Sequence, residues 1–124
     1  MAKTFQDKTG AEVAVDLSES TQSYQITVAD GTVAGHAYFL PGPDAETERI
    51  FHHTVVDEDF GGRGLSKILV AEALEDSRQR GITVVPVCPL FVKKLKETGD
   101  DYAAQGGKFR NATGADIDIV KRQV

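Results

Sequence analysis

A strand–helix–strand pattern in the middle of the chain sets the strongest constraint on its fold. Residues 49–56 carry apolar side chains on both faces, which is typical of a strand covered on both sides. Residues 65–80 place apolar side chains along one stripe of an amphipathic helix, and residues 82–88 are again almost continuously apolar. Because the connections are short, the two strands are predicted to be parallel and joined by a right-handed crossover. Pro89 suits the first turn of another helix, predicted over residues 90–97.

The segment before this unit has the pattern of antiparallel strands. Apolar and polar residues alternate over residues 24–28, Asp30-Gly31 is a turn pair, and residues 32–40 follow as the second arm of a hairpin. Residues 12–17 also alternate and form either a further short strand or an irregular lead-in. We therefore predict a mixed α/β sheet that is antiparallel at first and parallel in the middle.

Length and composition indicate one globular domain that binds small ligands. The 124 residues suit a single domain spanning 1–124, since domains typically take roughly 100–200 residues. A net charge of −5, from 14 Lys and Arg against 19 Asp and Glu, disfavours nucleic-acid binding. Charged residues throughout the first 17 positions argue against a membrane span or a secretory signal, so we expect a cytoplasmic protein without a membrane partner. Cys88 is the only cysteine, which excludes an intrachain disulfide and a Cys-rich zinc site, and no metal is predicted.

A glycine-rich stretch, residues 60–66, lies between the first parallel strand and its helix. Glycine lets the backbone take positive φ and approach an anion closely, and the free N–H groups of the first helical turn point toward it. The position, beyond the carboxyl end of a parallel strand, is where open α/β sheets bind ligands. The stretch lacks the Gly-Lys-Ser/Thr of a Walker A loop, and Lys67 stands where a dinucleotide fingerprint has its third glycine. It is either a phosphate cradle or a plain turn.

Two further motifs flank the glycine-rich stretch. They are His53-Thr54 on the strand before it and Pro86-Val87-Cys88-Pro89 on the strand after the helix. Together, the three motifs resemble the GNAT superfamily of acyl-CoA-dependent N-acyltransferases, and most of all its short single-domain subgroup. The similarity covers residues 24–102, and residues 103–124 form a C-terminal extension without a counterpart.

The resemblance implies a site for acetyl-CoA or CoA in a sheet whose central parallel strands splay. The pyrophosphate would lie on the amides of residues 62–66, and the pantetheine arm would run beside residues 55 and 56. Gly61 stands where the superfamily usually has Gln or Arg, which removes one expected pyrophosphate contact. Pro86 has no N–H to give to a ladder, so we expect it to interrupt pairing with the first strand and open the groove. The predicted binding residues are Val55, Val56, Gly61, Gly62, Arg63 (which adds positive charge), Gly64, Leu65 and Ser66.

Three side chains are candidates for catalysis. His53 and His52 face opposite sides of a strand, and the subgroup pattern selects His53, either as a general base or as a hydrogen-bonded core residue. Cys88, just before a helix, is either a nucleophile whose thiolate the helix N-terminus favours or a packing residue. Tyr102 either protonates the departing thiolate, as the resemblance implies, or packs in the core.

The resemblance implies an N-acetyltransferase that moves an acetyl group from acetyl-CoA to a primary amine of a small molecule or a protein. The alternative is a non-catalytic acyl-CoA binding or sensing module, which the glycine at position 61 favours. A group of basic residues is either a solvated face or a contact for the 3′-phosphate of CoA. Its members are Lys93, Lys94, Lys96, Lys108 and Arg110. The sequence leaves the acceptor and the oligomeric state open.

Overall fold

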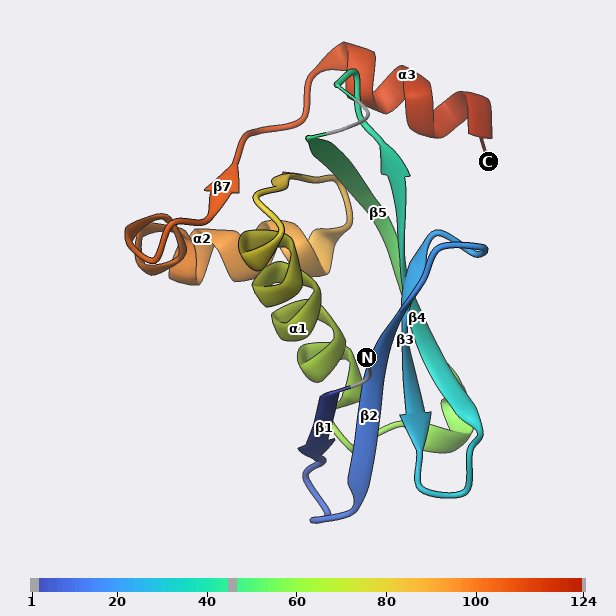
Figure 1. Ribbon diagram of the computed structural model, residues 1–124. Coiled ribbons are helices and arrows are strands. Elements are labelled where there is room, and N and C mark those ends of the chain that lie inside the picture. Colours follow the sequence, from blue (N-terminus) through green and yellow to red (C-terminus); the bar gives the residue numbers. More distant parts are fainter. Residues whose placement is uncertain (1–2, 45–46, 124) are drawn as a thin grey trace. The chain divides into compact units, whose positions relative to one another are not determined.

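The computed structural model describes residues 3–44 and 47–123 (Figure 1). Within these residues, seven strands form one sheet in chain order, accompanied by three α-helices and one short 3-10 helix. The elements are β1 (Lys3–Gln6), β2 (Glu12–Ser18), β3 (Ser23–Val28), β4 (Val33–Pro41), β5 (Glu48–Val56), η1 (Glu58–Phe60), α1 (Leu65–Gln79), β6 (Thr83–Pro86), α2 (Pro89–Ala104), β7 (Lys108–Phe109) and α3 (Gly114–Gln123). β1 to β4 pair antiparallel, while β5–β6 and β6–β7 pair parallel. The predicted mixed α/β fold is confirmed.

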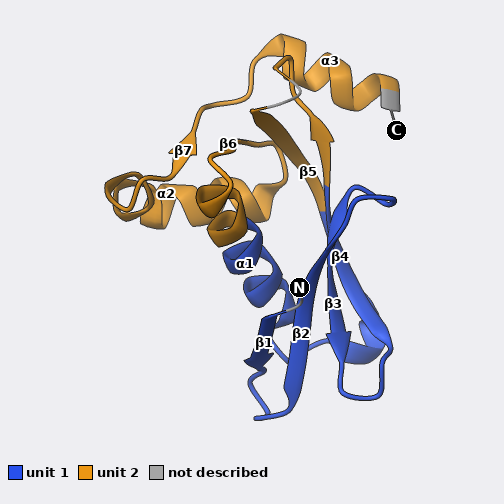
Figure 2. Cartoon of the chain, viewed as in Figure 1, with its two compact units in different colours: residues 1–38, 54–73 blue, residues 39–53, 74–124 orange. Residues whose placement is uncertain are grey.

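The chain divides into two compact units (Figure 2). Unit 1 comprises residues 1–38 and 54–73, and unit 2 comprises residues 39–53 and 74–124. Strands β4 and β5 and helix α1 each contribute residues to both units. Each unit has its own set of buried apolar side chains.

The antiparallel strands of unit 1 bury alternate side chains, as the sequence pattern predicts. Val15 of β2 lies opposite Ile26 of β3, and both side chains are buried. β1 was not predicted, because its side chains are mostly exposed and show no apolar alternation. Position 35 of β4 requires glycine, because a Cβ there would lie 2.6 Å from the carbonyl oxygen of Val55. The end of β5 therefore packs tightly on β4 within this unit.

Unit 2 is built around the first half of β5. Ile50 and Phe51 are completely buried, and the Phe51 ring stacks on Phe91 of α2 at 4.5 Å between centroids. The prediction that this strand is covered on both sides is right at these two residues. It is wrong further along, where His53 is exposed and Val55 is 42% exposed.

Helix α2 extends seven residues further toward the C-terminus than predicted, ending at Ala104 instead of Glu97. Gly99 lies within the helix and packs against Phe109 of β7, where a Cβ would meet the ring at 2.8 Å. Glycine costs about 1 kcal/mol in a helix interior, and here it allows β7 to approach α2 closely.

The C-terminal extension is part of unit 2. Arg110 binds Glu48 of β5 at 2.9 Å and Asp116 of α3 at 2.7 Å. The Asp116 carboxylate is fully buried and also accepts the backbone N–H and the hydroxyl of Thr113. The Arg110 guanidinium and these Thr113 bonds hold the pKa of Asp116 at about 2. This three-residue ion network attaches the start of α3 to β5.

Candidate functional site

The glycine-rich loop, residues 60–66, presents unused backbone donors in unit 1. Phe60 and Gly61 donate their N–H groups to Asp57 and Glu58 within the η1 turn. Beyond them, the N–H groups of residues 62–64 find no acceptor among the residues that the structure describes. Gly62 and Gly64 have φ values of +80° and +74°, and α1 begins immediately afterwards at Leu65. Consecutive free N–H groups at the start of a helix form a site that suits an anion.

The loop's arginine is engaged by a buried carboxylate. Arg63 donates to Asp7, whose side chain is fully buried in the turn between β1 and β2. Asp7 also accepts the N–H and hydroxyl of Thr9 and the N–H of Ala11. The Thr9 hydroxyl and the Arg63 guanidinium hold the pKa of Asp7 well below its ordinary value. The expected positive charge of Arg63 is therefore balanced by Asp7.

Lys8 touches the same loop, and sequence reasoning missed both it and Asp7. The Lys8 N–H donates to the Arg63 carbonyl at 3.1 Å. Its side chain lies against Gly64, where a Cβ would come within 3.2 Å of Lys8 Cγ. The local pattern Asp7-x-Thr9-Gly10 signals a turn, but no local signal indicates which loop that turn contacts.

In unit 2, the parallel ladder between β5 and β6 is short. It pairs residues 48–51 with residues 83–86, after which β5 continues to Val56 while β6 leads into α2. The Phe51 carbonyl accepts two N–H groups, from Val87 at 3.0 Å and from Cys88 at 2.9 Å. These bonds close the ladder, so the last five residues of β5 lie beyond its pairing with β6.

Pro86 interrupts a different ladder from the one predicted. Backbone groups of successive strand residues point alternately to the two neighbouring strands. The Val84 carbonyl accepts from Arg110 and so faces the β7 side, whereas the Val87 N–H faces Phe51 of β5. The Pro86 nitrogen, two residues after Val84, faces the β7 side. The prediction that Pro86 interrupts pairing with β5 is wrong, because its missing N–H ends the β6–β7 ladder instead.

The two histidines of β5 differ in their surroundings. The His53 side chain is exposed, whereas His52 is partly buried. Burial, with a smaller effect of the neighbouring His53, lowers the pKa of His52, so its ring stays neutral at neutral pH. The opposite orientations expected from strand parity are consistent with this difference in exposure.

Cys88 is the N-cap residue of α2, directly before its first helical residue. Its carbonyl accepts the N–H groups of Phe91 and Val92, and its side chain is only 4% exposed. Pro89 follows as the first helical residue, as predicted. The thiol therefore lies at a helix N-terminus and is buried, which is compatible with both roles that the sequence left open.

Comparison with known proteins identifies the family. Residues 23–105, two thirds of the chain, match the family described as GCN5-related N-acetyl-transferase. The chain belongs to this family. The predicted GNAT membership is thus confirmed, and acetyl-CoA is the typical co-substrate of such enzymes. The segment before residue 23, which holds β1 and β2, and the segment after residue 105 lie outside the match.

A solved structure supports the fold. The chain is similar to the NMR solution structure of a "GCN5-like putative N-acetyltransferase" from Staphylococcus aureus, with a TM-score of 0.52 and 20% sequence identity. The similarity covers 81% of this chain and 90% of that one. No curated protein matches the chain.

Tyr102, the third catalytic candidate in this family member, lies inside unit 2. Its side chain is buried, and its hydroxyl donates to the Leu74 carbonyl of α1 at 2.8 Å. Burial and the Glu75 carboxylate raise the pKa of Tyr102 to about 12. The hydroxyl thus retains its proton at neutral pH and uses it to join α2 to α1.

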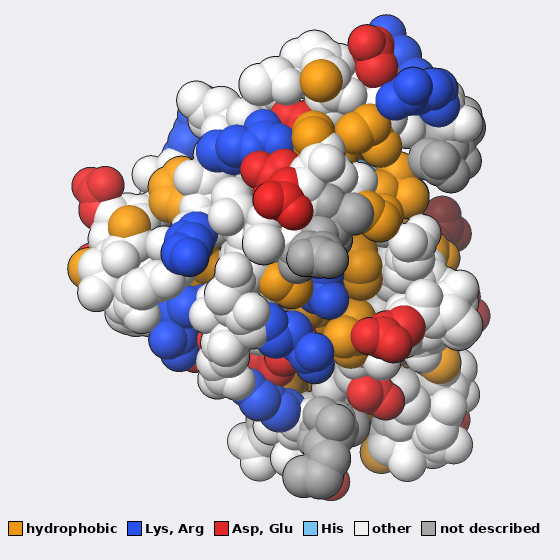
Figure 3. All heavy atoms as spheres, turned by 45° about the horizontal axis from the view of Figure 1, so that its top comes forward, with side chains coloured by type: hydrophobic (Ala, Val, Ile, Leu, Met, Phe, Trp, Pro, Cys, Tyr) orange, Lys and Arg blue, Asp and Glu red, His pale blue; other side chains and the backbone are white. Residues whose placement is uncertain are grey.

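The basic residues singled out in the sequence do not act as one group. Arg110 is committed to Glu48 and Asp116, so it is a structural residue. The four lysines of the group are exposed. On the face shown in Figure 3, Lys and Arg side chains are interspersed with Asp and Glu. This mixture is typical of a solvated surface.

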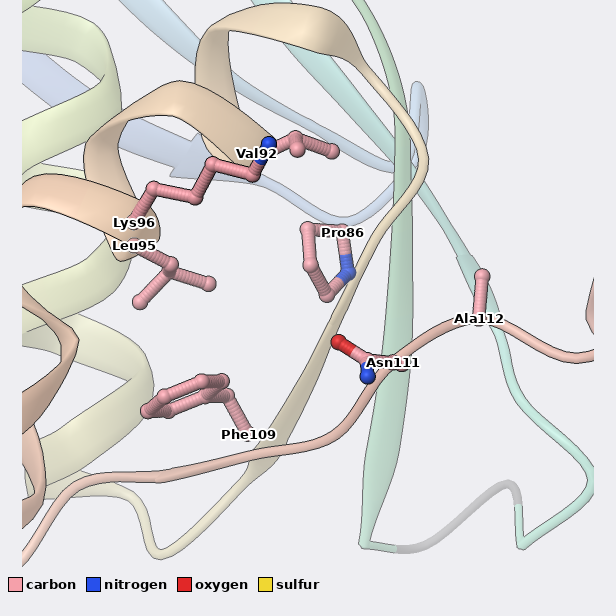
Figure 4. A pocket seen from close by; sticks show the side chains of 7 residues that line it. All are labelled: Pro86, Val92, Leu95, Lys96, Phe109, Asn111 and Ala112. Atoms are coloured by element: carbon pink, nitrogen blue, oxygen red, sulfur yellow. The ribbon is translucent and has the colours of Figure 1, made fainter.

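A cavity of about 290 Å³ lies where the β6–β7 ladder ends (Figure 4). Leu95 of α2 and Phe109 of β7 point toward each other across it, and the Asn111 side chain points into it. Pro86 lines the side of the cavity that faces Leu95 and Phe109. The cavity therefore lies beside the residue of β6 that has no N–H to offer to the chain after β7.

Among residues 3–44 and 47–123, no helix is long and apolar enough to cross a membrane. The same residues contain no group of three or more His, Cys, Asp and Glu side chains that could hold a metal ion.

Proposed function

We propose that this family member is an N-acetyltransferase that moves an acetyl group from acetyl-CoA to a primary amine of a small molecule or a protein. The observation that carries the proposal is the loop of residues 60–66, with unused N–H donors at the start of α1. Such donors suit the diphosphate of CoA. Family membership supplies the reason to assign CoA rather than another anion.

The residues present fit this co-substrate. A Cβ at Gly62 would meet nothing within 4 Å, so the space beside the loop is open to a ligand. The Ser66 hydroxyl lies in the first turn of α1, where it can donate to a phosphate oxygen. We further propose that the pantetheine arm runs beside Val55 and Val56 at the end of β5, where Val55 is 42% exposed.

The reaction requires an unprotonated amine. An alkylammonium, with a pKa of about 10.4, must first lose a proton, and we assign His53 as the base that accepts it. The amine nitrogen then forms its bond to the acetyl carbon while the carbon–sulfur bond breaks, and the proton that the nitrogen loses on becoming an amide neutralises the departing CoA thiolate. When bound, acetyl-CoA supplies the activated thioester. The residues that the sequence predicted for these steps are His53, Cys88 and Tyr102.

A non-catalytic acyl-CoA binding module is the second candidate. Two observations favour it: the absence of a long side chain at Gly61, and the donation of the Tyr102 hydroxyl to Leu74. Release of CoA thiol from acetyl-CoA, measured with a panel of primary amines, distinguishes the two candidates. A binding module binds acetyl-CoA without accelerating thiol release for any amine.

Calorimetric titration with CoA tests the loop. Gly62→Ala places a methyl group in the open space beside the donors, and we expect affinity to fall at least about tenfold. Gly31→Ala is a matched control, because Gly31 also has a positive φ (+91°) and open space around its Cβ position, but lies in the β3–β4 turn. Equal affinities of the two variants would contradict the placement of the diphosphate on this loop.

A further inference from the structure

The loop of residues 60–66 supplies little positive charge for binding a diphosphate. It lacks a basic side chain at Gly61, and its own Arg63 is balanced by the buried Asp7 carboxylate. Three acidic residues, 57–59, precede it directly and are all exposed. The negative potential of these carboxylates disfavours an approaching diphosphate. If CoA binds here, as the proposed function states, another cation is needed.

The turn between β1 and β2 is rigidly attached to this loop. Within the turn, Asp7 donates its N–H to the Ala11 carbonyl and accepts the N–H of Gly10, both at 3.0 Å. The Asp7–Arg63 ion pair and the bond from Lys8 N–H to the Arg63 carbonyl then join the turn to the loop. Lys8 is therefore held beside the loop by its own backbone N–H and by the ion pair of the preceding residue, Asp7.

Three carbons of the Lys8 side chain lie against Gly64 of the loop. A Cβ placed on Gly64 would lie 3.2 Å from Lys8 Cγ, 3.5 Å from Cδ and 3.4 Å from Cε. The ammonium nitrogen is one bond, about 1.5 Å, beyond Cε. In the part of the chain that the structure describes, this ammonium has no carboxylate partner. It is thus an unbalanced positive charge beside the unused N–H groups.

We propose that Lys8 is a diphosphate-binding residue for CoA. It supplies from the β1–β2 turn the positive charge that Gly61 does not supply from the loop. The proposal rests on the proposed function, and it concerns a segment outside the residues that match the family. Asp7 and Arg63 act as positioning residues, since their ion pair fixes the turn against the loop.

Calorimetric titration with CoA tests Lys8→Gln against two controls that remove the same charge. Lys67→Gln alters the other exposed lysine near the loop, and Lys121→Gln alters an exposed lysine on α3. At low salt, we expect Lys8→Gln to bind CoA about fivefold more weakly than either control. The difference should shrink at about 0.5 M salt, because the contact is solvent-exposed. Lys8→Arg should retain most of the affinity.

The same titrations with 3′-dephospho-CoA identify the phosphate that Lys8 contacts. Lys8→Gln should lose the same factor with this ligand, because the diphosphate is unchanged. A loss confined to CoA would place Lys8 at the 3′-phosphate and overturn the assignment. Equal affinities of Lys8→Gln and Lys121→Gln, or a loss only in Lys67→Gln, would also overturn it. Failure of the unaltered protein to bind CoA would instead refute the proposed function.

A rescue experiment tests the compensation directly. Gly61 has φ −63° and ψ 153°, a conformation that any residue can adopt, and a Cβ there would meet only the Glu58 carbonyl at 3.3 Å. Gly61→Arg should therefore fold after a small shift. Combined with Lys8→Gln, it should restore CoA affinity to within about twofold to threefold of the unaltered protein. A double variant as weak as Lys8→Gln alone would contradict the idea that the two positions supply the same charge.

Discussion

Replacing Asp116 with Asn tests whether charge holds the C-terminal extension in place. The Asp116 carboxylate accepts from both terminal nitrogens of Arg110, at 2.7 and 2.9 Å, and from Thr113. Asparagine has nearly the same size but carries no charge, and only one of its side-chain polar atoms is an acceptor. The variant therefore weakens the Arg110 contact without opening a cavity.

The expected loss follows from the pKa of Asp116. That pKa is lowered from 3.8 to about 2, which at about 1.36 kcal/mol per pKa unit corresponds to roughly 2 kcal/mol of folding free energy. Because the Arg110 side chain is 30% exposed and solvent screens it, we expect about 1–2 kcal/mol. A depressed pKa in the folded state stabilises the protein above the unfolded pKa. This contribution is therefore complete at pH 5–7 and is lost as the pH falls through 4 toward 2.

Urea unfolding at pH 7, 5 and 3 measures the effect. The difference between the unaltered protein and Asp116→Asn should be the same at pH 7 and 5 and about half as large at pH 3. Asp118→Asn is the control, because Asp118 is an exposed aspartate on the same helix. Equal stabilities of the two variants at pH 7, or a difference that does not change with pH, would refute the reasoning. CoA affinity should be unchanged in Asp116→Asn, since Arg110 is structural.

Three further predictions concern the catalytic candidates and Pro86. His53→Gln should lose the acidic limb of the pH–rate profile of acetyl transfer, whereas His52→Gln should keep it; the reverse result would assign the base to His52. If the acetyl group passes directly to the amine, intact-mass measurement of the protein mixed with acetyl-CoA alone should show no added mass. Cys88→Ala should then keep most of the rate. A gain of about 42 Da would instead make Cys88 a nucleophile. In Pro86→Ala, the new N–H should face the Arg110 carbonyl and resist hydrogen exchange, with CoA affinity unchanged; a loss of affinity would favour the groove-opening role that the sequence predicted.

Local patterns predicted the parts of the fold that local physics determines. The apolar run of residues 49–56, the helix after it and the run of residues 82–88 specify a parallel unit, because few other arrangements bury them. Two of the three glycines in the loop of residues 60–66, Gly62 and Gly64, are likewise explained, because both have a positive φ, which favours glycine. Residues 108–109 were not predicted as a strand, because two residues carry no periodicity. That strand pairs with β6, and Gly99 lets its Phe109 approach α2 closely.

Backbone direction explains the error at Pro86. A sequence shows that proline lacks an N–H, but not which neighbouring strand would have received it. That depends on strand order and register, and here β7, which the sequence did not reveal, occupies that side. The parity argument used for His52 and His53 applies equally to backbone groups. It would have indicated the correct side once β7 was known.

The sequence offered two arginines as phosphate ligands, and the structure pairs both of them with carboxylates. Arg63 is paired with Asp7, 56 residues earlier, and Arg110 with Glu48 and Asp116. Both aspartates have fully buried side chains, and a buried carboxylate needs a cation more than an exposed arginine needs an anion. A basic residue in a motif can therefore be predicted to bind a ligand only after each buried carboxylate has been paired with its cation. Applied to unit 1, this rule leaves Lys8 beside the loop with an unbalanced charge, although no motif includes it.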